Sequence, residues 1–189
     1  MRRSVAVLAL LSVWASGCTS QAPAPAPTGG STTPALAACR PDGLISVGEH
    51  LPDCAFRKFD GTVLDLTSLR GEPAVLNFWA SWCTFCIKEM PDFARFHADF
   101  KDRLAVIGFD LLGVEGEIEG AARSFALDRG ATYDLAFDPE GLLFAHFSVR
   151  PILPATIFVD ASGIVAHRSF GPLDETQLRE LAAEHLGVR

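Results

Sequence analysis

The chain has 189 residues, of which 49% are hydrophobic and 21% charged, enough apolar sequence to bury the core of one domain. Its formal net charge is −7 at pH 7, and no cluster of Lys and Arg is present, which disfavours nucleic-acid binding. The acidity favours solubility and says little about protein partners.

The first residues have the pattern of an export signal. A basic start, residues 1–3, precedes an apolar stretch at 5–14 that is too short to span a bilayer alone. Small residues then lead to Cys18, as in the bacterial lipobox, although Ala15 stands where Leu is usual. Residues 1–17 are therefore predicted to be a lipoprotein-type signal peptide, with Cys18 as the lipidation site. Plain secretion with a spare cysteine and an uncleaved anchor are the alternatives.

Residues 18–45 are predicted to be a flexible tether. They contain Ala-Pro repeats at 22–27 and a Gly-Gly-Ser-Thr-Thr run at 29–33, without the apolar periodicity that would offset the entropy of ordering. Such a spacer lets a folded domain, here residues 46–189, reach away from a membrane surface. We therefore expect an extracytoplasmic protein of the cell envelope that is lipid-anchored to the membrane, or secreted if the cysteine is not lipidated.

The rest of the sequence alternates strand and helix patterns. Strands are predicted as two short pieces of 56–66 around the turn Asp60-Gly61, and at 74–80, 104–110, 134–137, 155–160 and 164–170. Helices are predicted at 83–100, 117–129 and 140–147, and from about Asp174, which has capping-box spacing to Gln177. This order predicts an α/β sandwich around a central sheet with mixed strand directions.

The five cysteines fall into three groups. Cys18 belongs to the export signal, whereas Cys83 and Cys86 form a close pair with two residues between them. Cys39 and Cys54 remain, on the N-terminal side of the domain, and export makes a disulfide tolerable there. We predict that they form a structural bridge; the alternative is that both stay reduced.

The close pair has the arrangement that thiol–disulfide exchange requires. A strand is predicted to end at residue 80 and a helix to begin near Cys83, so unsatisfied backbone N–H groups and the helix dipole would stabilise a thiolate there. Cys86 lies one turn further inside, close enough to close a disulfide and less exposed. Cys83 is therefore the candidate nucleophile and Cys86 the candidate resolving thiol.

A metal site is the competing interpretation of the pair. Structural zinc needs four ligands, and the only other cysteines near the domain are Cys39 and Cys54. The histidines are scattered without ligand spacing, at His50, His97, His146, His167 and His185. Copper-delivering cysteine pairs are best known with a wider spacing. We therefore expect neither a metal nor a cofactor.

The cysteine motif and its flanks resemble a known family. Residues 76–91 read Leu-Asn-Phe-Trp-Ala-Ser-Trp-Cys-Thr-Phe-Cys-Ile-Lys-Glu-Met-Pro, and further matches lie at 51–53, 66–71 and 153–160. Together they are similar to the TlpA/ResA/CcmG group of membrane-tethered, thioredoxin-like proteins of the bacterial cell envelope. The resemblance covers roughly 46–186. It implies a thioredoxin-like fold with an N-terminal β-hairpin and a helix–strand insertion within 113–137.

The resemblance also implies roles for single residues. Pro154 matches the family's cis-proline, which lies opposite the cysteines and presents the backbone of the preceding residue, here Leu153, to the substrate. Glu89 matches an acidic residue beneath the active site that exchanges protons with the cysteines if it is buried. An ordinary surface glutamate is the alternative. Asn77 stands where thioredoxins proper carry an acid, so a proton relay cannot run through that position.

Two departures from the family pattern concern the substrate-facing surface. Arg150-Pro151-Ile152 replaces a glycine-containing approach to the cis-proline, so this loop is expected to have a different shape. Thr84-Phe85 between the cysteines matches neither strong reductants nor strong oxidants. Aromatic and apolar side chains could form a rim for a peptide, or could simply be packing: Trp82, Phe85 and Leu153.

The resemblance implies a thiol–disulfide oxidoreductase that acts on protein substrates, and we expect it to be a monomer. As a reductant it would serve cytochrome c maturation or copper-site assembly, with electrons from a membrane thiol transporter. The alternatives are an oxidase that introduces disulfides into exported proteins, and a chaperone or metallochaperone that uses the same groove without turnover. A peroxidase is disfavoured, because its local cysteine motif is absent. The sequence does not fix the direction of electron flow, since about 30 mV already corresponds to about 1.4 kcal/mol for two electrons.

Overall fold

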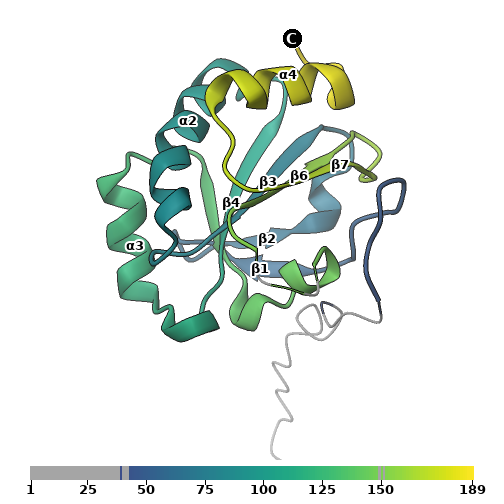
Figure 1. Cartoon of the computed structure of the whole chain (residues 1–189). Helices are drawn as coiled ribbons and strands as arrows, with labels where there is room; N and C mark the ends of the chain where they lie inside the picture. Colours follow the sequence, from purple (N-terminus) through teal and green to yellow (C-terminus); the bar gives the residue numbers. More distant parts are fainter. Residues whose placement is uncertain (1–38, 40–42, 149, 151) are drawn as a thin grey trace, which may run out of the picture. The chain divides into compact units, whose positions relative to one another are not determined.

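A computed structural model describes residues 39, 43–148, 150 and 152–189 (Figure 1). The predicted signal peptide, Cys18 and most of the predicted tether lie outside the described residues. Within the described part of the chain, no helix combines the length and the apolar character that crossing a bilayer requires.

The centre of the fold is a five-stranded mixed sheet with the strand order β5-β4-β3-β6-β7. Its strands are β3 (Ala74–Trp79), β4 (Ala105–Asp110), β5 (Asp134–Phe137), β6 (Ala155–Val159) and β7 (Val165–Phe170). β3 pairs in parallel with β4, and β4 with β5, whereas β6 runs antiparallel to both β3 and β7. Every residue of β3 is buried, as expected for an apolar run in the middle of a sheet covered on both faces. The predicted mixed α/β sheet is confirmed.

In the described part of the chain, three helices and the sheet share one apolar core. The helices are α2 (Thr84–Phe100), α3 (Glu119–Asp128) and α4 (Glu175–Leu186). Their buried aromatic and aliphatic residues pack with side chains of β3, β4 and β6, among them Trp79, Phe93, Phe96, Phe125, Phe158 and Leu178. The predicted capping box at the start of α4 is present, because Asp174 accepts from Gln177 N and the Gln177 side chain accepts from Asp174 N.

The other core contains the N-terminal hairpin. Strands β1 (Ala55–Arg57) and β2 (Val63–Asp65) pair antiparallel, and Gly61 takes a left-handed φ of 88° in the turn between them. Their inward side chains pack with those of the central strands and of the segment before β6, including Phe56, Leu64, Phe78, Phe109, Phe144 and Phe147. The hairpin and the predicted helix–strand insertion, which the structure forms as α3 and β5, are confirmed.

The predicted helix at 140–147 is wrong. The segment forms two separate 3₁₀ turns, Pro139–Gly141 and Phe144–His146. Asp138 accepts hydrogen bonds from Leu143 N and Phe144 N, and residues 140 and 141 take positive φ values, which a continuous helix cannot contain. The predicted helix at 117–129 begins later than expected, so Glu117 lies in the loop before α3.

Cys39 and Cys54 are joined by an S–S bond of 2.11 Å, and both are buried. The carbonyl oxygen of Cys39 lies 3.0 Å from Nε2 of His146, in the segment that leads to β6. The bridge therefore ties the segment before the hairpin to the core that lies beneath it.

Removing this bridge in a Cys39→Ser/Cys54→Ser variant is expected to lower the free energy of unfolding by about 3 kcal/mol, the loss predicted by the chain-entropy model for a loop of this size. The bridged cysteines are 15 positions apart, against 3 for Cys83 and Cys86. A Cys83→Ser/Cys86→Ser variant should therefore lose less. Urea unfolding of both variants and of the oxidised wild type measures the difference, and an equal loss in the two variants would contradict the expectation.

Candidate active site

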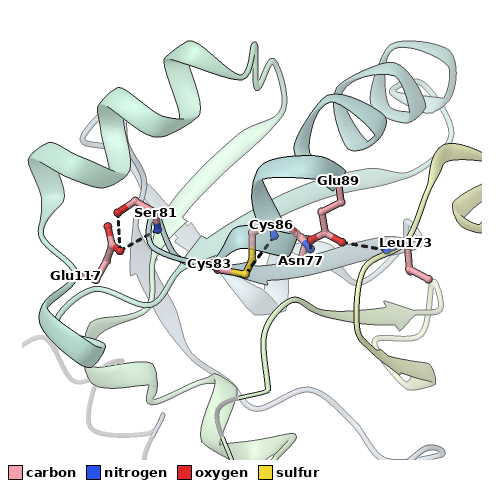
Figure 2. Close-up of a disulfide and its surroundings, with 7 residues drawn as sticks. All are labelled: Asn77, Ser81, Cys83, Cys86, Glu89, Glu117 and Leu173. Atoms are coloured by element: carbon pink, nitrogen blue, oxygen red, sulfur yellow. Dashed lines mark hydrogen bonds between the residues drawn. A yellow bond between two sulfur atoms is a disulfide. The ribbon is translucent and has the colours of Figure 1, made fainter.

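The Cys83–Cys86 disulfide lies where the central strand β3 passes into α2 (Figure 2). β3 ends at Trp79, a tight turn follows in which Cys83 N donates to Ala80 O, and Cys83 is the N-cap of α2. The S–S bond is 2.13 Å, and Cys86 N donates to Cys83 Sγ at 3.2 Å. The apolar strand fixes the entry of the chain, and the helix start presents its free N–H groups to the first sulfur.

The two cysteines differ in exposure and in their relation to the helix. Cys83 is 5% exposed at the helix start, whereas Cys86 is 0% exposed inside the first turn. After reduction, the Cys86 N–H and the positive end of the dipole of α2 would stabilise negative charge on Cys83 Sγ. The geometry therefore places one slightly exposed cysteine at the start of the helix and one fully buried cysteine inside its first turn.

Glu89 lies on the inner face of α2 and is only 2% exposed. Asn77 Nδ2 donates to its Oε1 at 2.8 Å, and Leu173 N donates to its Oε2 at 3.1 Å. Burial raises the pKa of Glu89 to about 8, against the opposing effect of these two hydrogen bonds. A surface glutamate is therefore excluded, and a carboxyl that is mostly protonated at neutral pH lies within one helical turn of Cys86.

Asn77 has a place in the site that the sequence did not reveal. It lies on β3, is 1% exposed, and its amide holds the carboxyl of Glu89 from the side of the sheet. A polar residue in an otherwise apolar buried strand was the available signal, since such a residue needs a hydrogen-bond partner. Its partner lies on the following helix and could not be identified from spacing alone.

The Leu153–Pro154 peptide bond is cis. In the sheet, Ala155 at the start of β6 is paired with Phe78 near the end of β3, so Pro154 lies beside the strand end that leads to Cys83. Pro154 O accepts from Gly171 N at 2.9 Å, which connects this turn to the end of β7. The residue that the resemblance assigned to the substrate groove therefore lies at the same end of the sheet as the disulfide.

Large apolar side chains are exposed near this end of the sheet. Trp82 and Phe85 flank Cys83 in the chain and are 40% and 53% exposed, and Ile152, just before the cis bond, is 49% exposed. Leu153 is partly buried and packs against both cores. The role of these side chains as a peptide-binding rim stays a prediction. Among the described residues, no group of three or more His, Cys, Asp or Glu side chains could hold a metal ion.

Three buried acids near the site were not singled out from the sequence. They are Asp110 at the end of β4, Glu117 in the loop before α3, and Asp138 after β5. Burial raises the pKa of Asp110 to about 8, with further increases from Glu117 and Asp138, and burial raises the pKa of Asp138 to about 7. Glu117 Oε2 accepts from both N and Oγ of Ser81, each at 2.9 Å. Acidic residues are usually exposed, so the burial of these three could be recognised only from the tertiary structure.

A mixed sheet that delivers a cysteine pair to a helix N-terminus beside a cis-proline is the architecture of thioredoxin-like thiol–disulfide oxidoreductases. Comparison with known proteins supports this assignment. The model of the AhpC/TSA family matches residues 47–168, well over half of the chain, and the chain belongs to this family.

Individual relatives are also thiol–disulfide proteins. The thiol:disulfide interchange protein DsbE homolog of Paracoccus denitrificans is 36% identical over 70% of this chain and 72% of its own. The thiol-disulfide oxidoreductase ResA of Bacillus subtilis is 28% identical over 72% and 74%. The exposed lipoprotein thioredoxin Etrx1 of Streptococcus pneumoniae superposes with a TM-score of 0.61 at 26% identity, covering 70% of this chain and 98% of that structure. The chain is thus a thioredoxin-like oxidoreductase, and the predicted similarity to ResA-type proteins is confirmed.

Proposed function

We propose that Cys83 and Cys86 carry out thiol–disulfide exchange with protein substrates. In the reducing direction, the Cys83 thiolate attacks one sulfur of a substrate disulfide, forms a mixed disulfide and releases the other substrate sulfur as a thiolate. Cys86 then loses its proton and attacks Cys83 Sγ, which releases the second substrate thiolate and closes the Cys83–Cys86 disulfide. Two electrons pass to the substrate, and its two thiolates take up protons. The hydrogen bond from Cys86 N to Cys83 Sγ at the start of α2 is the observation that carries this proposal.

The ionised form of Glu89, a minor fraction at neutral pH because the pKa is about 8, is proposed to take up the proton of Cys86 during the second step and to return it in the reverse reaction. Its pKa of about 8 is close to the ordinary value for a cysteine thiol, about 8.5, so a proton can move either way at little cost in free energy. Asn77 and the backbone of Leu173 keep the carboxyl in place in both protonation states.

The substrate is proposed to bind along the exposed apolar side chains at this end of the sheet. Backbone of Leu153, before the cis-proline Pro154, would pair with an extended peptide, and Trp82 and Phe85 would contact its side chains. The exposure of both aromatic rings supports this assignment, because exposed large apolar groups that cluster at one place are typical of binding surfaces.

The cellular role is proposed to be reduction in cytochrome c maturation or copper-site assembly, with electrons from a membrane thiol transporter and with the protein anchored by a lipid on Cys18. The sequence resemblance to the TlpA/ResA/CcmG group supports the reducing role. Support for the anchor comes from the export-signal pattern of residues 1–18 and from the similarity to an exposed lipoprotein.

A redox titration of the Cys83–Cys86 pair against glutathione tests the direction. We expect a potential nearer the value of about −270 mV for thioredoxin than the value of about −120 mV for the oxidant DsbA. A potential close to the DsbA value would contradict the proposed reducing role and would favour the alternative, an oxidase that introduces disulfides. A Cys39→Ser/Cys54→Ser variant should titrate identically, which assigns the signal to the pair at the start of α2.

A further inference from the structure

Glu117 reaches from the loop after β4 to the segment that carries Cys83. Its side chain is 3% exposed, and its Oε2 accepts from the backbone N and the Oγ of Ser81. In Figure 2 this contact lies on one side of the disulfide, and Glu89 with Asn77 and Leu173 lies on the other. The turn before Cys83 is therefore held by a carboxyl that comes from outside the motif.

The loop that presents Glu117 is itself closed by backbone hydrogen bonds. Gly113 N donates to Glu117 O at 2.9 Å, and Glu117 N donates to Val114 O at 3.0 Å. The same loop makes a second contact with the motif, because Trp82 Nε1 donates to Val114 O at 3.3 Å. Two consecutive residues of the turn, Ser81 and Trp82, are thus fixed by one compact loop.

The position of Ser81 determines where the first sulfur lies. Between Ala80 and Cys83 the chain forms a single turn closed by Cys83 N to Ala80 O at 3.1 Å, so a shift of Ser81 moves Cys83 with it. Cys83 Sγ in turn receives the Cys86 N–H. This bond and the helix dipole act over a short range and in a fixed direction, so a small displacement of the turn weakens the stabilisation of a thiolate.

Holding a carboxyl at this place is unfavourable for the fold. Glu117 Oε1 is buried and has no hydrogen-bond partner among the described residues. Asp110, which is 0% exposed, lies near enough for the charge of Glu117 to add to the effect of burial on its pKa. Crowding buried carboxyls costs free energy. The side chain of Glu117 accepts its hydrogen bonds from Ser81. These contacts with the turn are therefore the benefit that can offset the cost in stability.

We propose that Glu117 is a positioning residue for disulfide exchange: through Ser81 it holds the turn that sets Cys83 Sγ against the first N–H groups of α2. The proposal rests on the function proposed above for Cys83. It assigns to Glu117 an effect on the reactivity of the sulfur, which a purely structural contact would not have.

Comparing Glu117→Ala with Glu117→Gln tests the proposal. Both substitutions remove the carboxylate charge, but glutamine keeps an oxygen that can accept from Ser81, so their difference isolates the hydrogen bonds. The readouts are the rate at which iodoacetamide alkylates Cys83 in the reduced protein, followed against pH, and kcat/KM for reduction of insulin disulfides. The alanine variant should be slower than the glutamine variant by about fivefold to tenfold at pH 7 in both, with the titration of Cys83 moved to higher pH.

The matched control is Glu115→Gln, which removes the same charge from an exposed position of the same loop and should leave both rates unchanged. Equal rates for the alanine and glutamine variants would overturn the proposal. If Glu117→Ala does not fold, Ser81→Ala against wild type serves instead, with alkylation expected to be about twofold to threefold slower and equal rates counting against it. A wild type that alkylates normally but does not reduce insulin would instead contradict the proposed function.

Discussion

A Cys83→Ser variant is expected to reduce insulin disulfides at least about 1,000-fold more slowly than wild type, because a serine hydroxyl cannot replace a thiolate as the attacking group. A Cys86→Ser variant should fail differently. Its Cys83 can still attack, but nothing resolves the product, so a covalent complex with the substrate accumulates. Non-reducing gel electrophoresis and mass spectrometry of the reaction mixture distinguish the two results.

The asymmetry between these variants follows from exposure and from the helix start. Cys83 is the less buried sulfur and accepts the Cys86 N–H, whereas Cys86 lies inside the first turn. If Cys83→Ser gave the trapped complex and Cys86→Ser did not, the two roles would be exchanged. The Cys39→Ser/Cys54→Ser variant is the control, because it removes the other described disulfide and should keep wild-type turnover at temperatures where it is folded.

The main features of the fold and the cysteine pair could be predicted because their signals are local. A nearly continuous apolar run predicts β3, the Asp60-Gly61 turn predicts the hairpin, and the spacing of Asp174 and Gln177 predicts the start of α4. The spacing of Cys83 and Cys86 and the predicted strand before them identify the redox pair. In each case the residues that make the structure are neighbours in the chain.

The unpredicted features depend on contacts between residues that are distant in the sequence. Glu117 and Ser81 are 36 positions apart, and nothing near either of them indicates the pairing. The helix expected at 140–147 failed for a related reason, because its apolar pattern suits a helix but the side chain of Asp138 binds Leu143 N and Phe144 N. Burial of an acid is a property of the assembled core, and local sequence carries little information about it.

Replacing Glu89 by glutamine is expected to change how stability depends on pH. The pKa of this carboxyl rises from an ordinary value of 4.5 to about 8 on folding, so the folded state binds its proton more tightly than the unfolded state. The resulting stability is fully present below about pH 4.5 and is lost as the pH rises towards about 8. Glu89→Gln has no such proton, so its free energy of unfolding should fall less between pH 5 and pH 8, by on the order of a few kcal/mol.

Urea unfolding of the oxidised protein at several pH values measures this effect. Glu180→Gln, which removes an exposed carboxyl from α4, is the matched control and should follow the wild-type curve. The slope is the informative quantity, because glutamine cannot accept from both Asn77 and Leu173 and will cost some stability at every pH. Wild-type and Glu89→Gln curves that run parallel would show that Glu89 does not titrate in this range.

The same proton links the stability of the fold to turnover. If Glu89 exchanges protons with Cys86, the glutamine variant should resolve the mixed disulfide about 100-fold more slowly at pH 7, the usual size of a general acid–base contribution. Raising the pH should recover part of this rate, since Cys86 then loses its proton to solvent without help. A flattened stability curve with unchanged turnover would establish a buried, titrating carboxyl that takes no part in exchange. A change in both the stability curve and the turnover would mean that the burial of Glu89, although it costs free energy, has a role in exchange. It brings the pKa of Glu89 close to that of the Cys86 thiol, with which Glu89 exchanges protons.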